Sequence, residues 1–362
     1  MNIVIDCRMY NSSGVGVYLR NIIPFFLISN NNFILLGDET LLKQYINSNV
    51  KIISLKIKAF SINEILFFLN NKIKKIINNA DIFYTPFYNI PSGIKIPIYT
   101  TIHDIIFPDI PELTSKTGLF IRMLFYKYAY KKSEKIFTVS YFSKTRIQYH
   151  LGNKKKIIIA NPGIQDTIIK FKKTINNINK TNNIVYIGNI KKHKGLKYLL
   201  NAFISFINEG YNYKLILIGT RENIFRGKYK ISKDISLLNN NSIIFTGYIS
   251  DNEMLKILSE AALLVQPSVY EGFGIPPLEA MYLGTKVLIS DIPVFKEIYN
   301  EFPVKYFKTE NSEDLKNQLI KILVNEKQDN LTLSSDLANK YKFVNTADII
   351  LKNLTEYISS HV

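Results

Sequence analysis

The sequence predicts an α/β protein made of two domains, each built on a parallel sheet. Its length of 362 residues suits about two domains of ordinary size. Near the amino terminus, the apolar run of residues 2–6 is followed by a glycine-containing loop and then by a segment with helical apolar periodicity. The same order of strand, glycine-flanked loop and helix restarts at residue 184. Repeated units of this kind are typical of parallel sheets covered by helices.

The composition narrows the classes of function. The formal net charge of +17 admits nucleic acid, an anionic membrane surface or anionic small molecules as partners. The basic residues are nearly all lysines and no nucleic-acid-binding module is recognisable, so we expect no nucleic acid partner. The single cysteine, Cys7, leaves no intrachain disulfide, and no apolar run approaches the ~20 residues of a membrane span. We expect a cytoplasmic protein, either free or attached at the inner face of the plasma membrane.

Two features of the first domain lie at the ends of predicted strands. The loop Gly14-Val15-Gly16 stands between the first strand and the first helix, where backbone amides can cradle a phosphate, although a plain tight turn also fits. Residues 97–102 form an apolar strand that runs into His103. Polar residues at the carboxyl end of a strand lie where open α/β sheets bind ligands, while a lone histidine is also compatible with a structural role.

Residues 116–132 combine aromatic side chains with basic ones and form a predicted helix. Helices that lie on a membrane pair Lys or Arg with large apolar groups, so this segment is the main candidate for contact with an anionic membrane. A helix packed against protein, with its charges reaching out to water, fits the same pattern. The sequence leaves both interpretations open.

The second domain is expected to begin after a linker. Residues 166–182 are rich in Lys, Asn and Thr and show no clear period, which indicates a connection between domains. Residues 184–187 then form a strand, followed by a loop with Lys194 directly before Gly195 and a helix. An ammonium group and a helix N-terminus both attract negative charge, so this loop suits a diphosphate. Its neighbours Lys192 and His193 are expected to be solvated.

The stretch of residues 267–291 carries the most specific pattern of the chain. It opens with a turn of small residues after Glu271, and two prolines follow where a helix begins. The helix contains Glu279 and ends at Gly284, a C-terminal capping position that favours glycine. A buried strand is predicted at residues 286–290. Two carboxylates therefore bracket a helix N-terminus, which is a place that offers backbone N–H groups to a ligand.

This stretch resembles the E-x7-E signature of retaining glycosyltransferases of family four. The match comprises Glu271 and Glu279 with the intervening Gly272-Phe273-Gly274 and Pro276 and the following Ala280-Met281. The resemblance implies the GT-B fold, with two Rossmann-like domains and a cleft between them. It implies an acceptor-binding domain at residues 1–165, the linker at 166–182, a nucleotide-sugar-binding domain at 183–345, and a last helix at 346–362 that crosses back to the first domain.

The resemblance also assigns roles to residues. Glu271, His103 and Lys194 are expected to be catalytic: Glu271 would grip sugar hydroxyls, His103 would lie beside the donor sugar, and Lys194 would oppose the charge of the diphosphate. Asn189 stands where the family usually has an arginine, and Glu279 would bind the ribose hydroxyls. The expected donor-binding set is Gly14, Val15, Gly16, Asn189, Lys194, Gly247, Tyr248, Ile249, Gly272, Phe273, Gly274, Ile275 and Glu279.

The implied reaction moves a hexose, with mannose as the first choice, from a nucleotide diphosphate sugar to a hydroxyl of a growing surface glycan. That acceptor would be lipopolysaccharide O-antigen or capsule, free or lipid-linked. GDP-mannose is the first donor expected, while UDP- and dTDP-sugars stay open. No cofactor or metal site is expected, since no Asp-x-Asp motif stands in the family's place. Two alternatives remain: a nucleotide-sugar epimerase of GT-B fold, and a non-catalytic basic protein that binds a surface.

Overall fold

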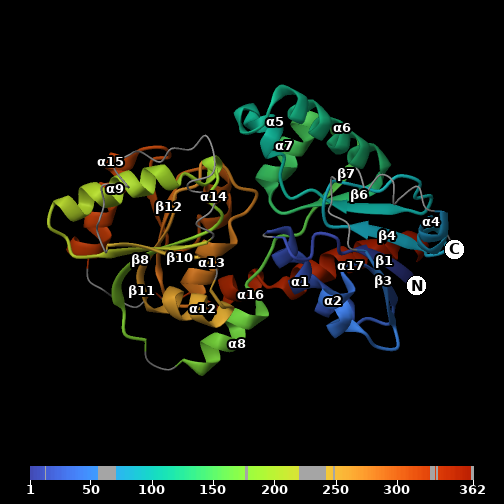
Figure 1. Ribbon diagram of the computed structural model, residues 1–362, viewed down its shortest axis with the longest axis horizontal. Coiled ribbons are helices and arrows are strands. Elements are labelled where there is room, and N and C mark those ends of the chain that lie inside the picture. Colours follow the sequence, from blue (N-terminus) through green and yellow to red (C-terminus); the bar gives the residue numbers. More distant parts are fainter. Residues whose placement is uncertain are drawn as a thin grey trace. The chain divides into compact units, whose positions relative to one another are not determined.

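The computed structural model describes residues 1–12, 14–55, 71–175, 178–219, 242–247, 249–326, 331 and 333–359. The chain divides into two compact units (Figure 1). The first unit comprises Met1–Gly163 together with Lys342–Val362, and the second comprises Ile164–Tyr341. Each unit is an α/β domain with one parallel sheet, as the sequence predicts. No helix among the described residues is both long and apolar enough to cross a membrane.

The first unit contains a seven-stranded sheet in the order β3-β2-β1-β4-β5-β6-β7. All neighbouring strands run parallel. The strand order reverses between β1 and β4. The connection after β1 leads to β2 on one side of this point, and the connection after β4 leads to β5 on the other side. The strands are β1 (Asn2–Asp6), β2 (Asn32–Gly37), β3 (Val50–Ser54), β4 (Ile82–Thr85), β5 (Ile98–Thr101), β6 (Ser133–Thr138) and β7 (Lys156–Ile159).

Helices cover both faces of the first sheet (Figure 1). Helix α1 (Val15–Phe26) buries a stripe that includes Tyr18, Ile22 and Phe26, and it packs against α17 (Phe343–Ser359), the C-terminal helix. On the other face, apolar side chains of α4, α6 and α7 meet those of the strands. The remaining helices are α2 (Glu39–Leu42), η1 (Lys43–Tyr45), α4 (Asn71–Asn78), α5 (Ile106–Asp109), η2 (Pro111–Leu113), α6 (Lys116–Lys132) and α7 (Tyr141–Leu151).

The second unit contains a six-stranded parallel sheet in the order β10-β9-β8-β11-β12-β13. Counted from its own first strand, this order is 3-2-1-4-5-6, which is that of a Rossmann fold. The point of reversal lies between β8 and β11. The strands are β8 (Thr181–Ile187), β9 (Lys214–Ile218), β10 (Ile243–Gly247), β11 (Ala261–Gln266), β12 (Lys286–Ser290) and β13 (Lys305–Phe307).

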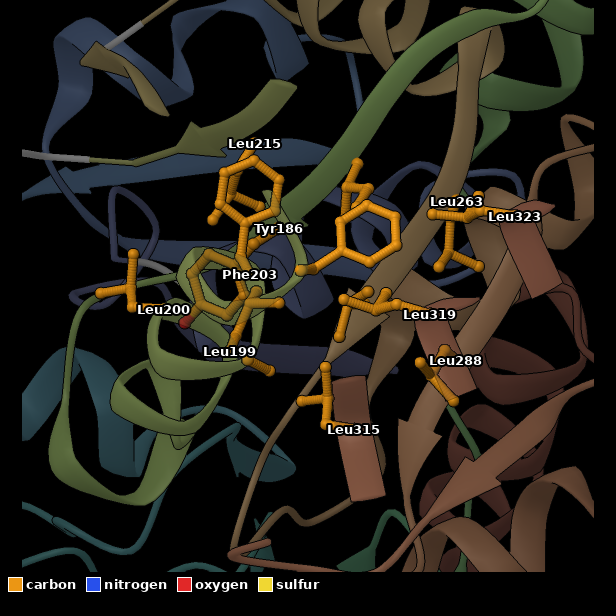
Figure 2. Packing of buried hydrophobic residues seen from close by; sticks show 14 of the residues in the cluster. Tyr186, Leu199, Leu200, Phe203, Leu215, Leu263, Leu288, Leu315, Leu319 and Leu323 are labelled. Carbon is orange, nitrogen blue, oxygen red and sulfur yellow. The ribbon is translucent and has the colours of Figure 1, made fainter. Parts of the chain in front are cut away.

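The core of the second unit lies under two helices. Figure 2 shows Phe203 and Leu199 of α9 (Leu196–Asn208) among leucines of the strands and of α15 (Ser312–Ile320). Burying such side chains contributes roughly 1.5–3 kcal/mol each. Helices α9 and α15 cover one face of the sheet and α12 (Asp251–Glu260) covers the other (Figure 1). The other helices are α8 (Asp166–Thr174), η3 (Lys192–Lys194), α13 (Ile275–Tyr282), α14 (Pro293–Tyr299), η4 (Lys321–Asn325) and α16 (Ser335–Lys340).

Residues 166–182 do not form the irregular linker that their composition predicts. They contain helix α8, the segment after it and the first residues of β8. The helix begins with Asp166 and carries Lys172 and Lys173 in its last turn, charges that complement the helix dipole, and its Ile168 is 1% exposed. The second unit accordingly begins at Ile164 and ends at Tyr341, so the expected boundaries at residues 183 and 345 are corrected.

Candidate functional site

Two loops meet where the strand order of the second sheet reverses. One follows β8 and covers residues 188–195, and the other follows β11 and covers residues 267–274. In open α/β sheets, ligands bind outside the carboxyl ends of the strands at this point of reversal. Both predicted second-unit catalytic residues lie here, Lys194 at the end of the first loop and Glu271 within the second.

Lys194 and Glu271 form an ion pair that joins the two loops. The Lys194 Nζ lies 2.7 Å from Oε1 and 2.8 Å from Oε2 of Glu271. The side chains are 23% and 11% exposed, respectively, so both charges are largely removed from water while remaining accessible. An ammonium has three N–H donors and the carboxylate engages it at two oxygens, which leaves Lys194 able to bind a further acceptor.

Buried serine and glutamine side chains support Glu271 from the β11 side. Ser268 Oγ donates a hydrogen bond to Glu271 Oε1 (2.7 Å), and it accepts one from Gln266 Nε2 (3.0 Å). Ser290, the last residue of β12, donates a hydrogen bond to the Ser268 carbonyl at 2.5 Å. Ser268 was not among the expected site residues. Its signal in the sequence is a small polar residue shortly after a strongly apolar strand, three positions before Glu271.

The electrostatic setting keeps Glu271 ionised. Burial alone would raise the pKa of its carboxyl, but the Lys194 ammonium and the hydrogen bonds from Lys194 and Ser268 outweigh burial and lower the pKa. Burial, together with the charge of Lys194, lowers the pKa of His193 to about 4. His193 is therefore neutral at pH 7, and it is half-buried rather than solvated as expected. Its carbonyl accepts a hydrogen bond from the Val269 amide (2.8 Å), which ties the loops together.

Gly195 allows the two loops to touch. Its φ is +65°, a conformation that side-chain-bearing residues rarely adopt, and a Cβ at this position would lie 1.8 Å from the Pro267 carbonyl oxygen. Helix α9 starts directly after it, so the Lys194 side chain stands beside the N-terminus of a 13-residue helix. A helix N-terminus and an ammonium together favour a bound anion.

Helix α13 brings the second predicted carboxylate into the protein interior. Gly272 and Phe273 are buried, Gly274 caps the helix with a left-handed conformation, and Ile275 is its first residue. Glu279 is 4% exposed and accepts a hydrogen bond from Gln165 Nε2 at 2.7 Å. Burial raises the pKa of the Glu279 carboxyl to about 7, despite that hydrogen bond. Near neutral pH, Glu279 is thus poised between a carboxylate that only accepts hydrogen bonds and an acid that can also donate.

The remaining predicted residues of the second unit follow neighbouring strands. Asn189 comes two residues after β8, where its carbonyl accepts hydrogen bonds from Tyr186 Oη (3.2 Å) and the Lys191 amide (3.0 Å). Gly247 ends β10, which is separated from β8 by one strand, and Ile249 follows it. Tyr248 lies outside the described residues. Because all strands are parallel, Asn189 after β8 and Gly247 at the end of β10 lie at the same edge of the sheet as the loops that carry Lys194 and Glu271.

The first unit gathers its own predicted residues at the carboxyl edge of its sheet. Gly14 precedes α1, which begins with Val15 and Gly16. Tyr18, on the first turn of that helix, packs edge-to-face on the His103 ring with a centroid distance of 4.8 Å. Burial lowers the pKa of His103 to about 4, so the ring is neutral. Its Nε2 lies 2.8 Å from the Pro86 carbonyl and must donate to it, which leaves Nδ1 as a hydrogen-bond acceptor.

A buried ion pair at the end of β1 was not predicted. Arg8 binds Asp6 through Nε (2.8 Å) and Nη2 (2.6 Å), and both side chains are fully buried. Thr85, the last residue of β4, also donates to Asp6. The pair lies where the order of the first sheet reverses, and its signal in the sequence is a carboxylate at the end of an otherwise apolar strand. Buried pairs of this kind are costly to break.

The arrangement in the second unit is suited to an anionic ligand with hydroxyl groups. A cation beside a helix N-terminus can oppose negative charge, and an ionised carboxylate can accept hydrogen bonds from hydroxyls. Among the residues that the structure describes, no cluster of three or more His, Cys, Asp or Glu side chains is placed to hold a metal ion.

Sequence comparisons show that the second unit is similar to known glycosyltransferases. The family model described as glycosyl transferases group 1 matches residues 168–335. The O-antigen chain mannosyltransferase RfbU of Salmonella typhimurium is 31% identical over 208 residues, which is 55% of this chain and 53% of that protein. The serotype-specific mannosyltransferase WbdA of Escherichia coli is 31% identical over 125 residues, 34% of this chain and 15% of that protein. The chain thus spans about half the length of RfbU and far less of WbdA.

Solved structures share the fold over nearly the whole chain. Sucrose-phosphate synthase from Thermosynechococcus elongatus covers 100% of both chains with a TM-score of 0.76 and 13% identity. Anabaena HepE, in complex with UDP and glucose, covers 98% of this chain and 100% of its own with a TM-score of 0.73 and 17% identity. At such low identity, the likeness concerns the fold alone.

Proposed function

Residues 168–335 match the family of glycosyl transferases group 1, and from this premise we propose that the chain is a retaining hexosyltransferase. Its fold is that of the GT-B glycosyltransferases, with two Rossmann-like domains. The proposed reaction moves mannose from a nucleotide diphosphate sugar to a hydroxyl of a growing surface glycan, such as O-antigen or capsule. The observation that carries the proposal is the Lys194–Glu271 pair at the reversal point of the second sheet.

The donor's diphosphate would bind beside Lys194 and the N-terminus of α9. As the bond between the anomeric carbon and the phosphate oxygen breaks, negative charge builds on that oxygen, and a fixed cation stabilises it. Lys194 can serve this purpose while it stays paired, since Glu271 does not exhaust its donors. The helix dipole adds to the same effect.

Glu271 is better suited to orient the sugar than to attack it. Both of its oxygens are engaged by Lys194, and Oε1 also accepts from Ser268. A carboxylate held in this way is a weak nucleophile but a well-oriented hydrogen-bond acceptor. These contacts favour a front-face reaction over a double displacement through Glu271. The acceptor oxygen would bond to the anomeric carbon on the face that the phosphate leaves, and the departing phosphate oxygen would take the acceptor's proton.

The remaining donor contacts are proposed from where the residues lie relative to the strand ends. Glu279 would accept hydrogen bonds from the ribose hydroxyls, and Asn189 with Gly247 and Ile249 would line the nucleotide. Backbone amides near Gly274 and Ile275 would hold the sugar. In the first unit, Gly14, Val15, Gly16 and His103 stay proposed substrate contacts, with Nδ1 of His103 able to accept a hydrogen bond from a hydroxyl.

The donor and acceptor are proposed from the relatives. RfbU and WbdA are named mannosyltransferases, and RfbU is named for O-antigen chains, which supports GDP-mannose as the first donor to test. HepE has been solved with UDP-glucose, which makes UDP-sugars the second class to test.

The proposal is tested by nucleotide release from a panel of GDP-, UDP- and dTDP-sugars, measured with and without a lipid-linked glycan acceptor. We expect acceptor-dependent release with GDP-mannose, and a loss of roughly 10²–10³-fold in kcat for Glu271→Gln, in line with removal of one electrostatic contact to the transition state. Glu313→Gln is the matched control, because Glu313 is 69% exposed in the same unit. Conversion of the donor to an isomer without acceptor would instead identify an epimerase.

We further propose that transfer needs no divalent metal, because Lys194 and the α9 N-terminus supply positive charge at the diphosphate. Excess EDTA is expected to leave the rate unchanged. A rate that vanishes with EDTA and returns with Mg²⁺ or Mn²⁺ contradicts this.

A further inference from the structure

Helix α6 exposes an apolar stripe that nothing in the described structure covers. Of the nine large hydrophobic side chains that are exposed in the described part of the chain, five lie on α6 and its neighbour α7. Phe120 is 64%, Ile121 47% and Leu124 52% exposed on α6, and α7 adds Tyr141 and Tyr149 at 60% and 75%. Single exposed apolar side chains are ordinary, but a gathering of this kind marks an interaction site.

The three α6 side chains share one side of the helix. Positions 120, 121 and 124 are spaced one and three residues apart, so they project within a limited arc. Another side of α6 is buried through Tyr126 and Ala129. The helix is thus apolar on two sides, which is typical of a helix that packs against a partner on each side. The described part of the protein covers only the side with Tyr126 and Ala129.

Basic residues lie on the same side of α6, closer to its C-terminus. Lys127 and Lys131 follow Leu124 at helical spacing and are exposed. We call Phe120, Ile121, Leu124, Lys127 and Lys131 the α6 stripe. In all, α6 carries five lysines and arginines and no acidic residue, and α7 carries two and no acidic residue. An anionic surface is the complementary partner of such a stripe.

We infer that the α6 stripe lies on an anionic lipid bilayer. Phe120, Ile121 and Leu124 would enter the boundary between headgroups and acyl chains, while the lysines would contact anionic headgroups. A second copy of this chain fits less well, because a two-fold interface would bring the basic α6 helices of both copies together without acidic partners. The inference does not depend on the proposed transfer reaction.

The chain contains no tryptophan, which permits a direct test. Phe120→Trp places a single reporter in the stripe, and Ile28→Trp places one at a 79% exposed position elsewhere in the first unit. With vesicles of phosphatidylcholine containing about one third phosphatidylglycerol, we expect a blue shift of the tryptophan fluorescence in the Phe120→Trp variant and none in the Ile28→Trp variant. Vesicles of phosphatidylcholine alone should bind weakly, and added salt should release the protein from the anionic ones.

Sedimentation with the same vesicles measures the contributions to affinity. Combined Lys127→Glu and Lys131→Glu is expected to weaken binding by more than roughly 20-fold, since each lysine near an anionic surface contributes a factor of about five. Lys43→Glu with Lys51→Glu is the matched control, because both lysines are exposed in the first unit. Combined Phe120→Ser, Ile121→Ser and Leu124→Ser should reduce binding by at least about tenfold, with an unchanged melting temperature.

Three results would overturn the inference. The first is equal vesicle binding by the wild type and the α6 variants, and the second is no binding by the wild type. The third is a wild-type dimer, seen by light scattering, that the triple serine variant converts to a monomer. That last result would assign the stripe to a second copy of the chain.

Discussion

The Glu271 carboxylate is fixed from two sides, by the Lys194 ammonium and by the Ser268 hydroxyl. Each contact favours the ionised form, and together they overcome the effect of burial on its pKa. Ser268 is itself held by Gln266 and Ser290. The position of the carboxylate therefore depends on residues that would not touch a substrate.

Ser268→Ala is expected to raise the pKa of Glu271, because it removes one hydrogen bond to the carboxylate. It also leaves the buried Gln266 amide without its acceptor, which costs roughly 1–3 kcal/mol of folding stability. Under the proposed function, kcat should fall by about tenfold with little change in the donor KM. The pH dependence of kcat and a melting curve measure both effects, and Ser268→Thr, which keeps the hydroxyl, should restore part of the activity.

Glu279 should make the stability of the protein depend on pH. Its folded pKa of about 7 lies above the ordinary value of 4.5, so the folded state holds this proton more tightly than the unfolded state. The stabilising contribution of the protonated form is complete below pH 4.5 and is lost as the pH rises to 7. The loss amounts to about 3 kcal/mol for a shift of this size.

Glu279→Gln removes that dependence, because the amide stays neutral and its oxygen can still accept from Gln165. We expect the variant and the wild type to have similar melting temperatures near pH 5, and the variant to be more stable near pH 8. A difference in melting temperature that is the same at both pH values would show that Glu279 does not titrate in this range.

The placement of several candidate residues was predictable because it follows from local sequence patterns. Lys194 and Glu271 each stand directly before a glycine, and Glu279 lies within the helix that follows Gly274, so the local pattern indicates loops and a helix N-terminus nearby. The partners of these residues were not predictable. Gln165 is 114 positions from Glu279, and no local pattern indicates that the two side chains meet.

At the scale of elements, the approach of the two loops after β8 and β11 depends on Gly195. Gly195→Ala adds a methyl group that would lie 1.8 Å from the Pro267 carbonyl oxygen, and φ is positive as well. The loops must move apart, so the Lys194–Glu271 pair should lengthen or break. We expect a loss of more than about 2 kcal/mol in unfolding free energy and weaker nucleotide-sugar binding, measured by thermal unfolding and calorimetry.

Gly210→Ala separates the effect of a positive φ from the effect of the contact with Pro267. Gly210 also has a positive φ, +93°, but a Cβ there meets nothing within 4 Å. This variant should show only the backbone strain of about 1 kcal/mol and unchanged ligand binding. Equal losses in the two variants would mean that the contact between the loops is not important.

Elements with strong caps or long apolar runs were predicted well. The strand at residues 286–290 is β12, and the helix before it ends where Gly284 adopts a positive φ. Helix α8 was missed because its nine residues offer only about two turns of periodicity among many lysines. Ile168 supports a helix here only once it is known to be buried. That burial depends on the second unit, in which α8 packs on α12.

At the scale of the whole molecule, the two units repeat one plan. Both sheets begin with the order 3-2-1-4, and in both units the residues singled out from the sequence follow the strands at or near the reversal. The α/β class was predictable because strand–loop–helix order is written locally. The strand order was not, since it depends on which strands pair across long separations in sequence.

Calorimetric titration of the full chain with GDP-mannose and UDP-glucose tests directly whether the Lys194–Glu271 site binds a nucleotide sugar. We expect at least one of them to bind, with an affinity that Lys194→Ala weakens about tenfold or more. Lys192→Ala should bind as the wild type does, because Lys192 is exposed in the same loop and Glu271 pairs with Lys194. Equal weakening by both substitutions, or no binding of either nucleotide sugar, would contradict the assignment of this site.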